Sequence, residues 1–214
     1  MSLGDDERRQ RNSNGPIFLV INHMVEIVHA VSPVEWKKRG ALKLLPRTDA
    51  DEIRWVANVA IDFFILLKWI FLVTIWAIGV SHWFVVAVAI FLLVTNLHTY
   101  FWYHLWTIER GAAIPGSEFR DRRRFVNLIF ALGYSMALYA YLYHRVLESD
   151  FTWPQPIAPW LSALVFSIGN SLTGFAGDLK PVSTVAHLVV SSQLVMTFIF
   201  VAMLLSNSVP RPRN

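Results

Sequence analysis

The sequence contains no cysteine, which excludes disulfide bridges and thiolate metal sites. Charged residues are also scarce, at 16% beside 55% hydrophobic residues, and this balance favours an integral membrane protein over a water-soluble domain. The basic residues lie next to apolar runs, so membrane topology explains them better than nucleic-acid binding does. We therefore expect contact with membrane lipid and none with nucleic acid.

Common catalytic motifs are missing as well. The chain has no G-x-S-x-G, no P-loop and no H-E-x-x-H pattern. Its seven histidines are scattered, and His98 and His104 are too far apart for the tight clusters of membrane di-iron enzymes. No span carries arginine at every third position, as a voltage sensor does. We therefore predict no enzyme, no cofactor and no metal site.

Long apolar runs divide the chain into membrane segments. Four of them are long enough to cross a bilayer, at 55–80, 83–108, 125–147 and 182–205. The predicted parts are a disordered tail (1–15), a membrane-surface segment with a basic connector (16–54), a peripheral transmembrane hairpin (55–108), a second basic connector (109–124), a second membrane module (125–207) and a tail (208–214).

The segment before the first span has an amphipathic pattern. Asn22, Glu26 and His29 fall on one face of a helix over 17–31. That helix is too short to cross about 30 Å of hydrocarbon. The pattern fits a helix that lies in the membrane interface and equally a helix that packs on the protein.

The basic connectors predict the orientation of the chain. Lys and Arg accumulate at 35–54 and 109–124, and the positive-inside rule places both connectors in the cytoplasm. Four spans then put both termini in the cytoplasm, while the turn at 79–82 and the region 148–181 face the other side. We expect the protein in the cell membrane, plasma or inner.

Two charges lie inside the first span. Asp62 is near its cytoplasmic end, where the carboxylate can reach the membrane surface. Lys68 is deeper, and in an antiparallel hairpin that turns at 79–82 it lies level with Thr95 and Asn96, either of which can be its polar partner. Because intramembrane charges often mark functional sites, both a structural contact and a gating role remain open for Lys68.

Residues 159–181 hold a short apolar run that ends at a glycine-bearing turn, directly before the fourth span. A half-length segment, a turn and a full span together indicate a loop that enters the membrane and returns. Irregular backbone is tolerated at membrane depth where it lines a cavity, and pores use its carbonyls in place of an ion's water. Asp178 then lies at the outer mouth, where an acid concentrates cations.

The same stretch has a familiar pattern. Residues 163–178 read A-L-V-F-S-I-G-N-S-L-T-G-F-A-G-D, which resembles the potassium-channel pore helix and filter, A-L-Y-F-S-V-T-T-L-T-T-V-G-Y-G-D, without a gap. The chain over 125–207 is similar to small bacterial channels of the two-helix pore type. The resemblance implies an all-α membrane protein with four transmembrane helices and a re-entrant pore helix and filter loop between the third and fourth. It also implies a homotetramer, because the family's filter needs four loops.

The resemblance places the ion filter at Thr173, Gly174, Phe175, Ala176, Gly177 and Asp178. Thr173, Gly177 and Asp178 match the family's pattern, while Phe175 stands at a glycine position and Ala176 at the tyrosine position. A bulky residue resists the left-handed backbone angles that glycine takes there. We therefore predict passive conduction of a monovalent cation, K⁺ or Na⁺, with weak or absent potassium selectivity.

Polar residues of the fourth span are candidates to line the pore, and we place Gln193 and Thr197 there. The alternative is a non-conducting membrane scaffold or regulatory subunit that retains the channel frame. Phe175 is the feature that favours this alternative.

Overall fold

The computed structural model describes residues 20, 22–27, 50–102, 117–154, 157–172 and 178–208. The chain forms two compact units, 1–60 and 61–214, and helix α4 (Ala50–Ile78) crosses the boundary between them. In the first unit residues 22–27 are helical, and Asn22 Nδ2 donates a 2.7 Å hydrogen bond to Glu26 Oε1. This contact confirms that the two side chains share a helical face, whereas His29 lies outside the described residues.

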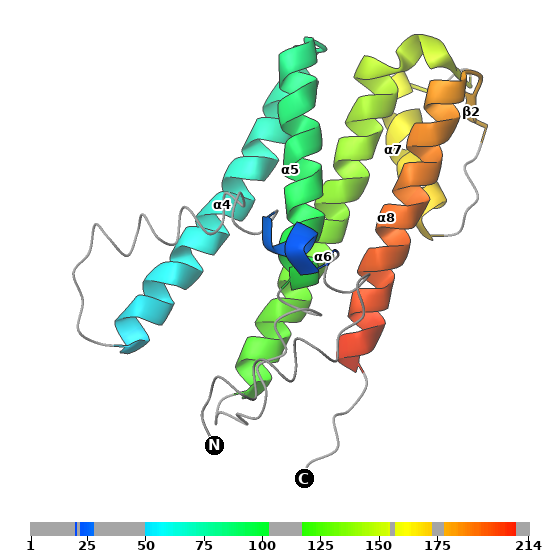
Figure 1. The fold of residues 1–214 in the computed structure, drawn as a ribbon. Coiled ribbons are helices and arrows are strands. Elements are labelled where there is room, and N and C mark those ends of the chain that lie inside the picture. The colour runs from blue at the N-terminus through cyan, green and yellow to red at the C-terminus, as the bar shows by residue number, and fades with distance from the viewer. Residues whose placement is uncertain are drawn as a thin grey trace. The chain divides into compact units, whose positions relative to one another are not determined.

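Four helices are long and apolar enough to cross a membrane, which confirms the predicted spans by length and composition. They are the apolar part of α4 (Asn58–Ile78), α5 (Trp83–Phe101), the apolar part of α6 (Ser117–Tyr141) together with its continuation to Val146, and the apolar part of α8 (Thr184–Ser208). Figure 1 shows α5, α6 and α8 running alongside one another. In the third span 56% of the residues are buried, against 22% in each of the others, so α6 is the central helix.

A tight turn joins α4 to α5. Gly79 has φ +75°, the one positive φ among the described residues, and glycine adopts that angle without a steric penalty. His82 then caps α5, because its Nδ1 accepts a 3.3 Å hydrogen bond from the backbone N–H of Phe84. The turn therefore sets how α4 and α5 are aligned along their lengths.

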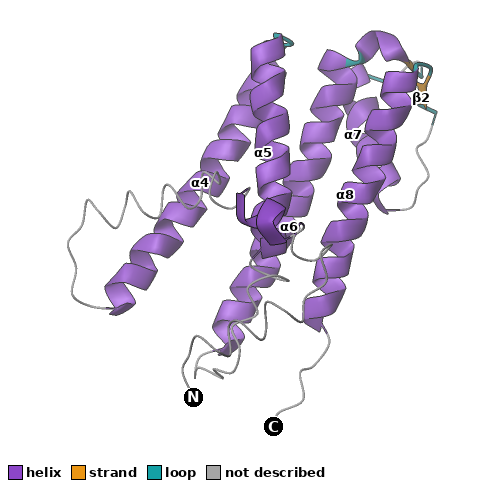
Figure 2. Ribbon diagram, in the orientation of Figure 1, coloured by secondary structure: helices purple, strands orange, loops and turns teal. Residues whose placement is uncertain are grey.

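Beyond Tyr141 the helix changes form. It continues as a π-helical turn, η2 (Leu142–Val146), then as a short 3₁₀ turn, η3 (Glu148–Asp150), and ends in the two-residue strand β1 (Phe151–Thr152). Strand β1 pairs antiparallel with β2 (Lys180–Pro181), with Phe151 opposite Pro181. This small ribbon (Figure 2) holds the two ends of the segment 153–179 together at one end of the helices.

Between these strands lies α7 (Pro159–Leu172), a helix of 14 residues that packs against α6 and α8 (Figure 1). Its first residue is proline, which suits the first position of a helix because no partner is needed for its nitrogen. The helix is about 21 Å long, too short for the ~30 Å of a bilayer core. The predicted half-length helix is therefore present.

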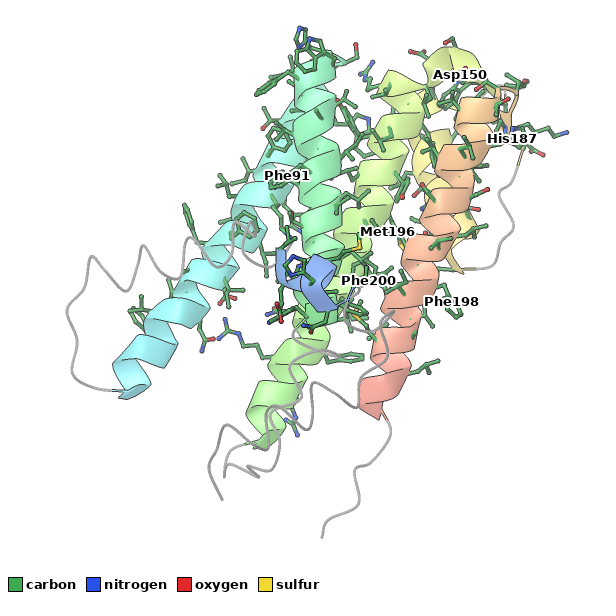
Figure 3. All side chains as sticks on the ribbon, viewed as in Figure 1. Phe91, Asp150, His187, Met196, Phe198 and Phe200 are labelled. Atoms are coloured by element: carbon green, nitrogen blue, oxygen red, sulfur yellow. The ribbon has the colours of Figure 1, made fainter. Side chains whose placement is uncertain are left out.

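Aromatic side chains form the core where these elements meet. The rings of Tyr143, Phe151 and Phe166 lie with centroids 5.2–5.7 Å apart and are all at least 95% buried. Further along, Phe200 of α8 is fully buried and packs with residues of α6, while Phe198 is 73% exposed on the outer side of α8 (Figure 3). Helix α8 thus has one packed face and one apolar face open to its surroundings.

Candidate functional site

The last turns of α7 are tied to α8 by a buried amide. Gln193 of α8 is 1% exposed, and its Oε1 accepts hydrogen bonds from Tyr143 Oη at 2.6 Å and from Asn170 Nδ2 at 3.0 Å. Its Nε2 lies 2.6 Å from Ser167 Oγ and 2.7 Å from Ser171 Oγ, to both of which it can donate. We call these five residues the Gln193 hub, and they connect η2, α7 and α8.

Two backbone carbonyls extend the hub into the neighbouring helices. Ser167 Oγ donates to the carbonyl of Met136 in α6 at 2.7 Å, and Asn170 Nδ2 also donates to the carbonyl of Val190 at 3.2 Å. Met136 lies inside the third candidate span and Val190 inside the fourth. These contacts place the C-terminal end of α7 level with the middle of both spans.

The placement of Gln193 argues against the pore-lining position that we predicted for it. A side chain buried within one chain, with both amide atoms in hydrogen bonds, has no surface left for a central pore. Thr197 is also buried, at 6% exposed. The sequence does hold a signal for the hub, because Ser167, Asn170 and Ser171 recur at a spacing of three and four and so share one face of α7.

The predicted filter falls mostly outside the described residues. Thr173, Gly174, Phe175, Ala176 and Gly177 are not among them. Asp178 is described; it is exposed and lies next to the buried Leu179, directly before β2. Because Asp178 lies next to the β1–β2 ribbon, it is at the same end of the helices as the N-terminus of α7.

Lys68, in the first candidate span, has one of the two partners that the hairpin alignment predicted. Lys68 Nζ donates a hydrogen bond to Asn96 Oδ1, which confirms that prediction, and Asn96 Nδ2 donates to the carbonyl of Ala131 at 3.1 Å. The ammonium also lies 5.2 Å from the ring centroid of Phe64 and 5.0 Å from that of Tyr134. A hydrogen bond and two aromatic faces thus offset part of the cost of burying this charge.

The second charge of this candidate span, Asp62, lies near the start of the apolar part of α4 and is paired. Arg123 Nη2 of α6 donates to Asp62 Oδ1 at 2.7 Å. The side chains are 28% and 59% exposed, so this is a surface ion pair that contributes little to stability. The Asp62 carboxylate thus has a partner on another helix, Arg123 of α6. The sequence predicted only that this side chain could reach the membrane surface, and it did not predict the ion pair.

A second junction joins the α4–α5 turn to η2. Trp76 Nε1 donates to His144 Nδ1 at 3.0 Å, and Tyr141 Oη donates to the carbonyl of Val80 at 2.7 Å. The Arg145 guanidinium lies against Gly79. Its Cζ atom is 3.4 Å from the position that a Cβ atom would take on Gly79. We call these contacts the outer junction, because they lie on the side that the positive-inside rule places outside.

Comparison of the chain with family models, with characterised proteins and with solved structures gives no match. Among the described residues, no group of three or more His, Asp or Glu side chains is placed to hold a metal ion. The features established so far are a mainly helical chain with four candidate transmembrane helices and a half-length helix anchored between two of them.

Proposed function

We propose that four copies of this chain form a pore-loop cation channel that resembles potassium channels. The observation that carries the proposal is the depth of α7, a helix of 14 residues whose last turn contacts Val190 and Gln193 inside the fourth span. The β1–β2 ribbon supports it, since it joins the two ends of the segment that contains α7. In this proposal α7 is the pore helix of a re-entrant loop.

In a membrane, the backbone carbonyls at the C-terminal end of α7 would need hydrogen-bond partners or water. The last four carbonyls of a helix have no partner within it, and unpaired backbone groups cost several kcal/mol each in hydrocarbon. Leu172, the last residue of α7, is 63% exposed in the single chain. Irregular backbone is tolerated at this depth only against protein or a water-filled cavity. Neighbouring copies of the chain would supply the protein surface, and a central pore between them would supply the water-filled cavity.

Electrostatics favour a cation at this position. A helix C-terminus carries about half a negative charge, so four α7 helices would together attract positive ions to the centre of the assembly. Residues 173–178 would form the filter, with Asp178 at the outer mouth. Phe175 and Ala176 replace the family's glycine and tyrosine, and for that reason we propose conduction of K⁺ or Na⁺ with weak selectivity.

The Gln193 hub has a structural task in this channel. It fixes the C-terminal turns of α7 to α8 and η2, so the first filter residue would start from a rigid anchor. Sites held within a fraction of an ångström need such supporting contacts. Gln193 is then a positioning residue instead of a pore-lining one.

A non-conducting scaffold or regulatory subunit is the second candidate. It is favoured by the burial of Gln193 and Thr197, which leaves the two polar side chains predicted for the pore without access to it. Such a protein would keep the tetramer and the four helices but carry no ions.

Measurement of ion flux from liposomes distinguishes the cation channel from the non-conducting scaffold. Purified wild-type protein should carry both K⁺ and Na⁺, and Phe175→Gly should shift the reversal potential towards that of K⁺. Phe84→Gly is the matched control, since Phe84 is exposed in the first turn of α5, and it should behave as wild type. A cross-linked tetramer without flux would establish the scaffold, and a monomer would refute both. A strongly potassium-selective wild type would contradict the weak selectivity.

A further inference from the structure

His144 holds a hydrogen bond that exists in only one of its charge states. The indole N–H of Trp76 is a donor and never an acceptor, so His144 Nδ1 must offer it a lone pair. A neutral imidazole does so when its proton is on Nε2. A protonated ring carries hydrogens on both nitrogens and cannot accept this bond.

The histidine also occupies an unusual piece of backbone. It lies in η2, the π-helical turn, next to Tyr143. These consecutive residues bind different parts of the molecule: Tyr143 donates to Gln193 in the hub, whereas His144 accepts from Trp76 in α4. A π-helical turn holds one extra residue per turn and is frequently found at functional sites.

Aromatic contacts make the connection from His144 to α7 continuous. The His144 ring lies edge-on to Trp153 at 6.0 Å, Trp153 lies 6.2 Å from Phe151, and Phe151 lies 5.7 Å from Phe166 of α7. A change at His144 can therefore reach α7 both through η2 and through these rings.

We propose that His144 is a proton-binding switch on the outer side of the protein, which releases the α4–α5 hairpin from η2 when it is protonated. Loss of the Trp76 bond frees η2 to change its helical form, and this moves Tyr143 relative to Gln193 at the end of α7. The effect on ion flow rests on the proposed channel function, whereas the release of the hairpin does not.

The charged groups close to His144 have opposite signs. They are Arg145 in η2 and Glu148 in η3. Residues 74–78 of α4 carry no titratable group, so α4 presents only the Trp76 ring to the histidine. The segment after β1 presents Trp153, which is also uncharged. The junction is therefore intact while the ring is neutral and is weakened as the pH falls.

A distance measurement tests the release directly. The chain has no cysteine, so Ser81→Cys and Ser149→Cys accept two spin labels at exposed sites on the two sides of the junction. Labelled chains are diluted with unlabelled ones in nanodiscs, and the distance distribution is recorded from about pH 8 to about pH 5, where histidine changes charge. We expect one narrow distance at the upper end and a broader, longer one at the lower end.

Two variants and one control identify the responsible group. Trp76→Phe keeps an aromatic ring but lacks the donor, so its distribution should already be broad at about pH 8 and should change little on acidification. His144→Gln should remove the pH response. His187→Gln should retain it, because His187 is an exposed histidine in the first turn of α8 and does not contact the junction.

Flux measurements then test the link to α7. With acid on the outer side alone, wild-type flux should change, and the response should be absent in His144→Gln but present in His187→Gln. An unchanged distance across the pH range, or a response that persists in His144→Gln, would overturn the switch. A changed distance with unchanged flux would overturn the coupling to α7. If no variant carries ions at any pH, the channel proposal fails and the distances alone decide the switch.

Discussion

The Gln193 hub makes a quantitative prediction for Gln193→Met. Methionine matches the unbranched shape of glutamine, so the change removes the amide and leaves the packing volume nearly intact. Tyr143 Oη then loses its hydrogen-bond partner inside the bundle, and Ser171 Oγ loses the donor from Nε2. Asn170 and Ser167 keep their bonds to backbone carbonyls of Val190 and Met136.

The magnitude follows from the groups left unpaired. A buried polar group without its partner costs about 1–3 kcal/mol in water-soluble proteins, but measured values between transmembrane helices average about 0.6 kcal/mol. With the values measured between transmembrane helices, which reach at most about 1.7 kcal/mol, two such groups give a loss of about 1–3 kcal/mol. For a chain of this size each kcal/mol lowers the melting temperature by about 2–4 °C, so the expected change is roughly 2–12 °C.

Thermal melting in detergent, followed by near-ultraviolet circular dichroism, measures this loss. Thr197→Val is the control, since it removes a hydroxyl one turn further along α8 that is not part of the hub. Tyr143→Phe should account for a share of the loss, and combining it with Gln193→Met should give less than the sum, because both remove the same bond. Melting of Gln193→Met at the wild-type temperature, or full additivity with Tyr143→Phe, would refute the stabilising role of the hub.

Four further substitutions test three other contacts by melting temperature. Lys68→Met should be neutral or stabilising, because it removes a charge whose burial costs about 3 kcal/mol at mid-membrane, whereas Asn96→Leu should destabilise by leaving that charge without its hydrogen bond; the opposite order would contradict this account. Gly79→Ala should cost about 1–2 kcal/mol, since alanine resists a φ of +75°, and wild-type stability would show that the turn can relax. Arg123→Gln should cost less than about 1 kcal/mol, and this loss should diminish in high salt; a larger, salt-insensitive loss would contradict a surface ion pair.

The parts predicted correctly from the sequence depend on short-range properties. Span length and hydropathy are local, so four candidate transmembrane helices could be identified without any tertiary information. The contact between Lys68 and Asn96 followed because a turn at 79–82 leaves two straight helices with little freedom to slide. The half-length helix that ends at Leu172 was predicted in a similar way, from an apolar run too short to cross a bilayer.

The three-dimensional contacts were decided only by the tertiary structure. The sequence shows Gln193 as a polar residue in an apolar span, but such a residue can face a pore or a neighbouring helix equally well. Which of these occurs depends on the rotation of α8 against α7, and that rotation is set by all of the side chains between them. The same holds for Trp76 and His144, 68 residues apart, and for the two-residue ribbon that joins β1 to β2. Hydropathy thus determined that the chain has four helices able to cross a membrane, whereas packing decided that α7 is anchored to α8 and η2 by a buried amide.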